Sequence, residues 1–313
     1  MLGTHCIFVP SLKTTQKMKS IISTALFTIL ILFKMNAQEQ NFKTIETNKF
    51  KLQVYNASEN SFGVASVIIS GKNDAVLIDA QFTLAEAEKV TQEIKNSGKT
   101  LTTIYVSHGD PDFYFGLEIF KKYFPEVTVY ASPATVEHIK ATAQKKLEVW
   151  GERLGDKITS NVILPQVLKG NSIELEGEKL EIIGLDEFPK RTFLWIPSIK
   201  TALGGINVFG TTFNLWMADA QTTEARNNWI SILNIISDLK PEIVIPAHAN
   251  TNSDFTIDAV NHTKNYIQFY EEALKSNTTS EALIATIKSK YPNLTFEAAL
   301  MLGAKVNTGE MKW

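Results

Sequence analysis

The order of strand-like and helical segments predicts a mixed α/β domain, with two sheets inside and helices outside. The chain opens with strand-like segments, continues as alternating strands and helices, and repeats a strands-first, helices-after order in its second half. Its 313 residues are 44% apolar, which is enough for a large core. No Pro/Gly/Ser-rich linker separates the halves, so we expect one domain over residues 38–313.

The elements of the first half follow from residue periodicity and turn signals. Alternating apolar residues, rich in β-branched and aromatic types, predict strands, whereas apolar residues three or four positions apart predict helices. The first helix ends near Asn96-Ser97-Gly98, a typical helix stop. The predicted strands are 50–55, 63–70, 75–78, 101–106 and 127–131, and the predicted helices are 84–94, 116–124 and 133–148.

The second half is again rich in strands before it becomes helical. Short apolar segments separated by turn residues predict the strands, and longer amphipathic segments predict the helices. The predicted strands are 172–175, 179–183, 192–196, 208–209, 213–217 and 242–246, and the predicted helices are 223–239, 254–275 and two short ones after residue 280.

The first forty residues have the features of a targeting segment. A basic region at Met18 precedes an apolar run over residues 21–33, and a small-residue cleavage site follows before Gln38. The run is short for a bilayer span, which favours a cleaved leader over residues 1–37 rather than a retained anchor. A periplasmic or secreted protein without stable membrane insertion is therefore expected. Residues 1–17 have no signal character, so Met18 is an alternative start.

Cysteine content and charge exclude several classes of site. The single cysteine, Cys6, lies in the predicted leader, so the mature protein would have neither disulfides nor thiolate ligands. Any metal must be held by His, Asp, Glu, Asn or backbone oxygen, which suit zinc, manganese, iron or calcium. A net charge of −2 without a long Lys/Arg block argues against nucleic acid as the main partner.

Several predicted strands end in a residue that can ligate a metal. Strand ends at one edge of a sheet converge on a common crevice, where sites in layered α/β proteins are often built. Asp is also common after strands for turn reasons alone. The five residues at predicted strand ends are Asp79, His108, Asp186, Asp219 and His248.

The segment from Ser107 to Gly116 is the most informative. It places His108, Asp110 and Asp112 directly after a buried strand, which suits a metal site. The alternative interpretation is a helix start, with Asp110 as the cap, Pro111 at the first helical position and Asp112 favoured by the helix dipole. Capping explains neither His108 nor the distant Pro246-Ala-His248, so both interpretations of the aspartates stay open.

The remaining polar and aromatic candidates have ordinary explanations. His138 and His262 fall within helical patterns without a partner at ligand spacing, which predicts surface or core histidines. Trp195, Trp216 and Trp229 are expected in the core or in a pocket wall. Neither a Gly-rich phosphate loop nor a G-x-S-x-G elbow is present, which counts against nucleotide binding and serine hydrolysis.

In these landmarks the chain resembles the metallo-β-lactamase-fold hydrolases. The resemblance extends from Val76-Leu-Ile-Asp79 to Pro246-Ala-His248, with the landmarks in the family's order. It implies an αββα four-layer sandwich of two mixed sheets, and one or two metal ions bound after a strand by a His-x-His-x-Asp-His loop.

Compared with that pattern, the ligand positions are altered. His108 takes the place of the first histidine, Asp112 that of the motif aspartate, and His248 that of the late histidine. Asp110 and Phe113 stand where the other two histidines are expected, and Phe cannot ligate. The nearest substitute for the mid-chain histidine is Asp186, or less favourably Glu187, and the bridging aspartate is replaced by Ile206.

The resemblance therefore implies a reduced site. We expect one ion of zinc, manganese or iron, held by an oxygen-rich set whose members are His108, Asp110, Asp112, Asp186 and His248. Such an ion would activate water, and one of the catalytic candidates Asp110 and Asp112 would take the proton.

The predicted function is that of an exported metal-dependent hydrolase. Its substrate would be a small molecule with an ester, lactone or related acyl bond. Two alternatives stay open: a relative that has lost catalysis and binds a small molecule or a partner, and a β-lactam hydrolase. The three-histidine zinc site typical of β-lactam hydrolases is not visible in the sequence.

Overall fold

The computed structural model describes Gly3 and residues 42–313, so the predicted leader (1–37) lies outside the described residues apart from Gly3. Within residues 42–313, the strands form a seven-stranded sheet and a five-stranded sheet. The larger sheet runs in the order β1-β2-β3-β4-β5-β6-β7, and its strands are β1 (Phe42–Glu46), β2 (Lys51–Asn56), β3 (Ala65–Ser70), β4 (Asp74–Ile78), β5 (Thr100–Val106), β6 (Thr128–Ala131) and β7 (Gln166–Val167).

The smaller sheet runs in the order β12-β11-β10-β9-β8. Its strands are β8 (Ser172–Leu175), β9 (Glu178–Ile183), β10 (Phe193–Ile196), β11 (Thr201–Leu203) and β12 (Ile243–Val244). Both sheets are mixed. The pairs from β1 to β4 are antiparallel and those from β4 to β7 are parallel, whereas β12 pairs with β11 in parallel and the other strands of the small sheet pair antiparallel.

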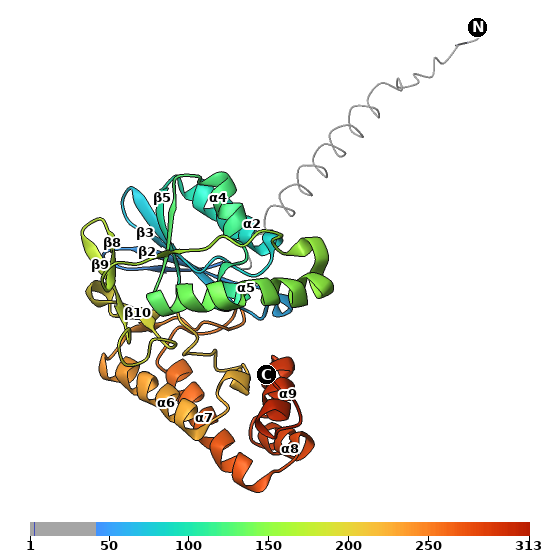
Figure 1. Cartoon of the computed structure of the whole chain (residues 1–313). Coiled ribbons are helices and arrows are strands. Elements are labelled where there is room, and N and C mark those ends of the chain that lie inside the picture. The colour runs from blue at the N-terminus through green and yellow to red at the C-terminus, as the bar shows by residue number, and fades with distance from the viewer. Residues whose placement is uncertain (1–2, 4–41) are drawn as a thin grey trace. The chain divides into compact units, whose positions relative to one another are not determined.

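Helices cover the outer sides of the two sheets. In Figure 1, α2 and α4 lie on one outer side of the molecule, and α6 and α7 lie on the opposite side. The helices are α2 (Leu84–Ser97), α3 (Pro111–Tyr114), α4 (Leu117–Tyr123), α5 (Pro133–Leu154), α6 (Thr223–Asp238), α7 (Asp258–Ser276), α8 (Ser280–Lys290) and α9 (Glu297–Asn307). No helix among the described residues is both long and apolar enough to cross a bilayer.

Alternation along the strands builds two apolar layers. Val67 and Ile69 of β3 join one buried cluster with Ile182 and Leu194 of the smaller sheet, which places that cluster between the sheets. Ile68 points the other way, into the cluster that also holds the buried faces of the helices. The predicted αββα sandwich is therefore confirmed.

The predicted strands 208–209 and 213–217 are wrong. No regular strand forms there in the described structure, because the segment pairs one residue at a time with chain from elsewhere. Phe209 bridges to His248, and Phe213 bridges to Thr295. The segment then turns into η4 (Met217–Asp219), a short 3-10 helix. These irregular contacts bring the late histidine and the C-terminal helices to the same place.

Candidate active site

Three strand ends meet at the loop that follows β5. Asp79, just after β4, accepts hydrogen bonds from the Ser107 backbone N–H (2.7 Å) and from the Ser107 hydroxyl (2.6 Å). The Gly205 N–H, just after β11, donates to the same Ser107 oxygen at 2.8 Å. Ser107 immediately precedes His108, so Asp79 fixes the start of the loop that carries the candidate ligands.

Asp79 is a buried carboxylate, only 3% exposed, in a left-handed backbone conformation (φ 62°) that Asp and Asn tolerate better than most residues. Burial raises its pKa to about 7, even though the two hydrogen bonds from Ser107 lower it. Because its folded-state pKa lies above the ordinary value of 3.8, protonation of Asp79 favours the folded state. This contribution to stability is fully present below pH 3.8. That stability is lost as the pH rises through about 7.

We expect Asp79→Asn to flatten this pH dependence. Asparagine cannot ionise, yet it keeps an acceptor for the Ser107 N–H and tolerates the same backbone. Between pH 5 and pH 8 the free energy of unfolding of the wild type should fall relative to that of the variant, by at most about 1.4 kcal/mol per pH unit. Urea unfolding across this range measures the difference. Parallel curves for both proteins would contradict the assignment, and Asp186→Asn, at an exposed position, serves as the control.

The candidate ligands form two pairs. Nδ1 of His108 lies 3.5 Å from Oδ2 of Asp110, and Nε2 of His248 lies 3.6 Å from Oδ2 of Asp112. Two ligands of one tetrahedral zinc ion, each about 2.1 Å from the metal, are about 3.4 Å apart. Each pair therefore has the spacing of two ligands of one ion, and we call the pairs the His108–Asp110 half-site and the Asp112–His248 half-site.

The hydrogen bond of His248 fixes its tautomer. Its Nδ1 lies 3.0 Å from the Phe62 carbonyl oxygen, which can only accept, so Nδ1 carries the proton and Nε2 presents a lone pair to Asp112. The ring also stacks on Phe209 and Phe296, which holds its plane. In metal sites, a backbone carbonyl commonly accepts a hydrogen bond from the ring nitrogen that does not bind the metal, and this orients the histidine ligand.

Burial sets the protonation of the Asp112–His248 half-site. The residues are 6% and 4% exposed. Burial lowers the pKa of His248 to about 4, and burial, followed by the negative charge of Asp110, raises the pKa of Asp112 well above its ordinary value. Two buried acceptors that face each other need a proton or a cation between them.

The His108–Asp110 half-site already has a cation beside it. Lys146 of α5 donates from Nζ to Oδ1 of Asp110 at 2.8 Å and to the Gly109 carbonyl at 3.0 Å. Its Nζ also lies 3.1 Å from Nε2 of His138. Burial raises the pKa of Asp110, but the fields of His108 and Lys146 outweigh it and hold that pKa at about 2. Asp110 is therefore a carboxylate at neutral pH.

Three of the positions that depart from the family pattern are occupied by apolar or exposed side chains. The buried Phe113 ring meets the His108 ring (centroids 5.2 Å apart) and the His248 ring (5.7 Å), both edge-on. Ile206 is 8% exposed in the loop against Ser107. Asp186 is exposed in the turn after β9. Among residues 42–313, no group of three or more His, Cys, Asp or Glu side chains is placed to hold one ion.

Asp110 lies at the helix-capping position, as the alternative interpretation predicts, but its side chain does not cap the helix. Asp110 occupies the position before α3 and Pro111 is its first residue, but the Asp110 side chain makes no capping hydrogen bond. Its oxygens face Lys146 and His108 instead, and Asp112 faces His248. The two carboxylates therefore face histidine and lysine side chains and do not cap the helix.

Comparison with known proteins agrees with this geometry. Residues 60–197 match the family model described as the metallo-beta-lactamase superfamily, and no curated protein matches. Among solved structures, a metallo-beta-lactamase from Pontibacter korlensis aligns at 18% identity with a TM-score of 0.50, over 72% of this chain and 99% of its own. Residues 60–197 therefore resemble the metallo-β-lactamase superfamily, and the chain has the fold of these solved structures.

Two further solved structures show the same likeness to this metallo-β-lactamase-fold protein. DIM-1 metallo-beta-lactamase aligns at 17% identity with a TM-score of 0.52, over 73% of this chain and 97% of its own. Metallo-beta-lactamase IND-7 aligns at 17% identity with a TM-score of 0.51, over 73% and 98%. Identities this low establish the fold and leave the substrate open. The superfamily itself suggests metal-dependent hydrolysis and usually binds divalent metals.

Sequence reasoning missed two residues of the site, Lys146 and His138. Both come from α5, some thirty residues after the motif, and both fit an ordinary amphipathic helix. The signal that could have found them is Gly109. A Cβ there would come within 2.5 Å of Cδ2 of His138, so this position requires glycine for His138 to pack on the loop.

Proposed function

We propose that this protein is an exported hydrolase that cleaves an ester, lactone or related acyl bond of a small molecule with the help of one divalent ion. The observation that carries the proposal is the buried Asp112–His248 half-site. Nε2 of His248 and Oδ2 of Asp112 face each other at the spacing of two ligands of one ion, and the hydrogen bond to the Phe62 carbonyl fixes the histidine tautomer. The superfamily fold around it supports hydrolysis as the reaction class.

The donor set fits one ion better than two. At the Asp112–His248 half-site, Phe113 and Ile206 replace the additional ligands of the family pattern, and at the other half-site Lys146 already neutralises Asp110. Asp112 and His248 would hold the ion, and His108, which contacts the same Phe113 ring, is a further donor in the motif loop. Two imidazoles and a carboxylate suit zinc, manganese or iron.

When bound, such an ion lowers the pKa of water and polarises an acyl oxygen. The chain's own residues prepare for this in different ways. Phe62 keeps Nε2 of His248 unprotonated, and Asp79 anchors the loop through Ser107. Before an ion binds, burial and the charge of Asp110 raise the pKa of Asp112, and binding of the ion would displace a proton from this carboxyl. Asp110, whose pKa is about 2, is a weak base that pairs with Lys146.

The proposal is tested with His108→Ala against a panel of generic esters, lactones and a chromogenic β-lactam. We expect the wild type with added zinc or manganese to hydrolyse at least one ester or lactone, and the variant to lose most of that rate while circular dichroism shows an intact fold. Turnover of the β-lactam alone would replace the proposed substrate class. Equal rates for variant and wild type would contradict the site assignment.

A further inference from the structure

Five aromatic side chains that are not fully buried form one connected surface, which we call the aromatic patch. Four of them are half-buried and the fifth, Trp313, is 56% exposed. Neighbouring ring centroids lie 5.5 to 5.9 Å apart along the series Trp150–Phe62–Phe296–Trp216–Trp313. The patch therefore joins five distant parts of the chain: the loop after β2, α5, the residues before η4 and α9, and the segment after α9.

The aromatic patch reaches the Asp112–His248 half-site through two of its members. The Phe296 ring stacks on the His248 ring, with the centroids 6.2 Å apart, and the Phe62 carbonyl oxygen accepts the hydrogen bond from Nδ1 of His248. The Phe62 and Phe296 rings also contact each other. A molecule that lay on the patch would therefore have one end beside the residues proposed to hold the ion.

Both of these linking residues have a left-handed backbone, with φ 62° for Phe62 and φ 60° for Phe296. They are the only aromatic residues with positive φ among residues 42–313. This conformation is rare for bulky side chains and costs free energy, and such residues gather at ligand-binding sites. Core packing does not account for them, because both rings stay half-buried instead of entering the core.

We propose that the aromatic patch binds an apolar part of the substrate, so that the esters or lactones of the proposed function carry a large apolar acyl group. The inference rests on the proposed function and extends its site. A connected, partly exposed apolar surface marks a place where apolar groups bind. Small-molecule sites combine such walls with a few polar groups, which here are His248 and Asp112 at one end of the patch.

Hydrolysis of 4-nitrophenyl acetate and 4-nitrophenyl octanoate tests the preference, because the two esters share a leaving group and differ by six methylenes. A methylene is worth about fourfold in affinity when it is fully buried, and less on a half-buried surface. For the zinc-loaded wild type we therefore expect kcat/KM to be at least about tenfold higher for the octanoate.

Variants on either side of the linking pair show whether the patch causes the preference. Trp150→Ala or Trp216→Ala should lower the octanoate preference by at least about threefold, and a loss in one of them is sufficient because one acyl chain follows one side. Trp150→Leu and Trp216→Leu retain an apolar side chain in case an alanine variant does not fold. Tyr123→Ala, whose residue is 41% exposed outside the patch, is the control and should keep the preference.

A binding measurement without turnover uses octanamide and acetamide as neutral probes of the metal-free full chain. Tryptophan fluorescence should change saturably with octanamide, because Trp150, Trp216 and Trp313 belong to the patch. Acetamide at the same concentration should have no effect. In the Trp150 or Trp216 variant that loses the ester preference, the Kd for octanamide should rise by at least about threefold.

The outcomes separate this inference from the proposed function. Ester hydrolysis with equal kcat/KM for both esters, or with a preference that survives in both tryptophan variants, would overturn the patch and leave the proposed function standing. Absence of ester hydrolysis together with saturable octanamide binding would support the patch and count against the proposed function. A dimer of the wild type that Trp216→Ala dissociates, without octanamide binding, would assign the patch to a second copy of the chain and overturn the inference.

Discussion

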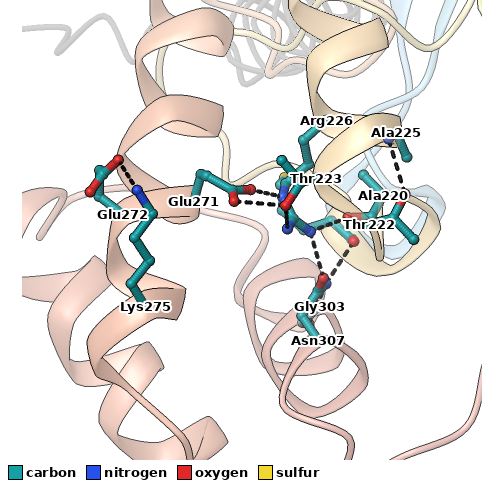
Figure 2. Close-up of polar contacts among 11 residues, drawn as sticks. Ala220, Thr222, Thr223, Ala225, Arg226, Glu271, Glu272, Lys275, Gly303 and Asn307 are labelled. Atoms are coloured by element: carbon teal, nitrogen blue, oxygen red, sulfur yellow. Dashed lines mark hydrogen bonds and ion pairs between the residues drawn. The ribbon is translucent and has the colours of Figure 1, made fainter.

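Replacing Arg226 with methionine is expected to lower the free energy of unfolding by about 3 kcal/mol, because it removes a buried guanidinium and leaves its three partners without a donor. Arg226, near the start of α6, is 5% exposed. Its Nε donates to Glu271 of α7, and one terminal nitrogen donates to the Ala220 carbonyl (2.7 Å) and to Asn307 of α9 (3.1 Å). Figure 2 shows these contacts converging on the guanidinium from α7, α9 and the end of η4.

The loss is large because the partners would remain. Methionine fills most of the volume, but Glu271, Asn307 and the Ala220 carbonyl would each lose a donor in a protected place. Burial raises the pKa of Glu271, and the hydrogen bond and charge of Arg226 overcome this and lower it. Since that pKa is depressed, the pair stabilises the fold above the ordinary pKa of Glu and ceases to do so as the pH falls through the lowered value.

Urea unfolding at pH 7 measures the effect. Lys275→Met is the matched control. Lys275 pairs with Glu272 on α7, the helix that also carries Glu271, at 2.7 Å and with both side chains more than half exposed. Its removal should change the free energy of unfolding by less than about 0.5 kcal/mol. Similar losses in both variants would show that Arg226 is not the anchor of the C-terminal helices.

The second large effect is expected for His248→Asn. The asparagine amide keeps a donor for the Phe62 carbonyl, but it removes the Nε2 lone pair that faces Asp112. Loss of one of the two aligned ligands should abolish tight metal binding and lower hydrolysis by more than about 100-fold, the upper range for disturbing a ligand's supporting contacts. Asp238→Ala is the control, since this exposed residue at the end of α6 should change neither property. Full activity in His248→Asn would remove His248 from the site.

Much of the fold could be predicted because its signals are local. The strands that lead to Asp79 and His108 are continuous apolar runs, and the turn residues between them mark their ends. The segment 208–217 could not be predicted as irregular, because its partners, His248 and Thr295, are distant in sequence. Apolar composition alone cannot distinguish such bridges from a strand.

The residues of the candidate site could be predicted, but their pairing could not. Strand ends placed His108, Asp112 and His248 in one crevice, and the structure brings them to a common ring, Phe113. How the donors pair depends on tertiary contacts that the motif does not contain. The Phe62 carbonyl fixes one histidine, and Lys146 engages Asp110. The ligand role predicted for Asp186 stays a prediction, with the side chain exposed in its turn.

Binding of one divalent ion at the Asp112–His248 half-site can be measured by elemental analysis of the purified wild type beside His248→Asn, both loaded with zinc or manganese and desalted. We expect about one equivalent of metal per wild-type chain and less than about a tenth in the variant. Less than about a tenth of an equivalent in the wild type, or equal amounts in the two proteins, would contradict it.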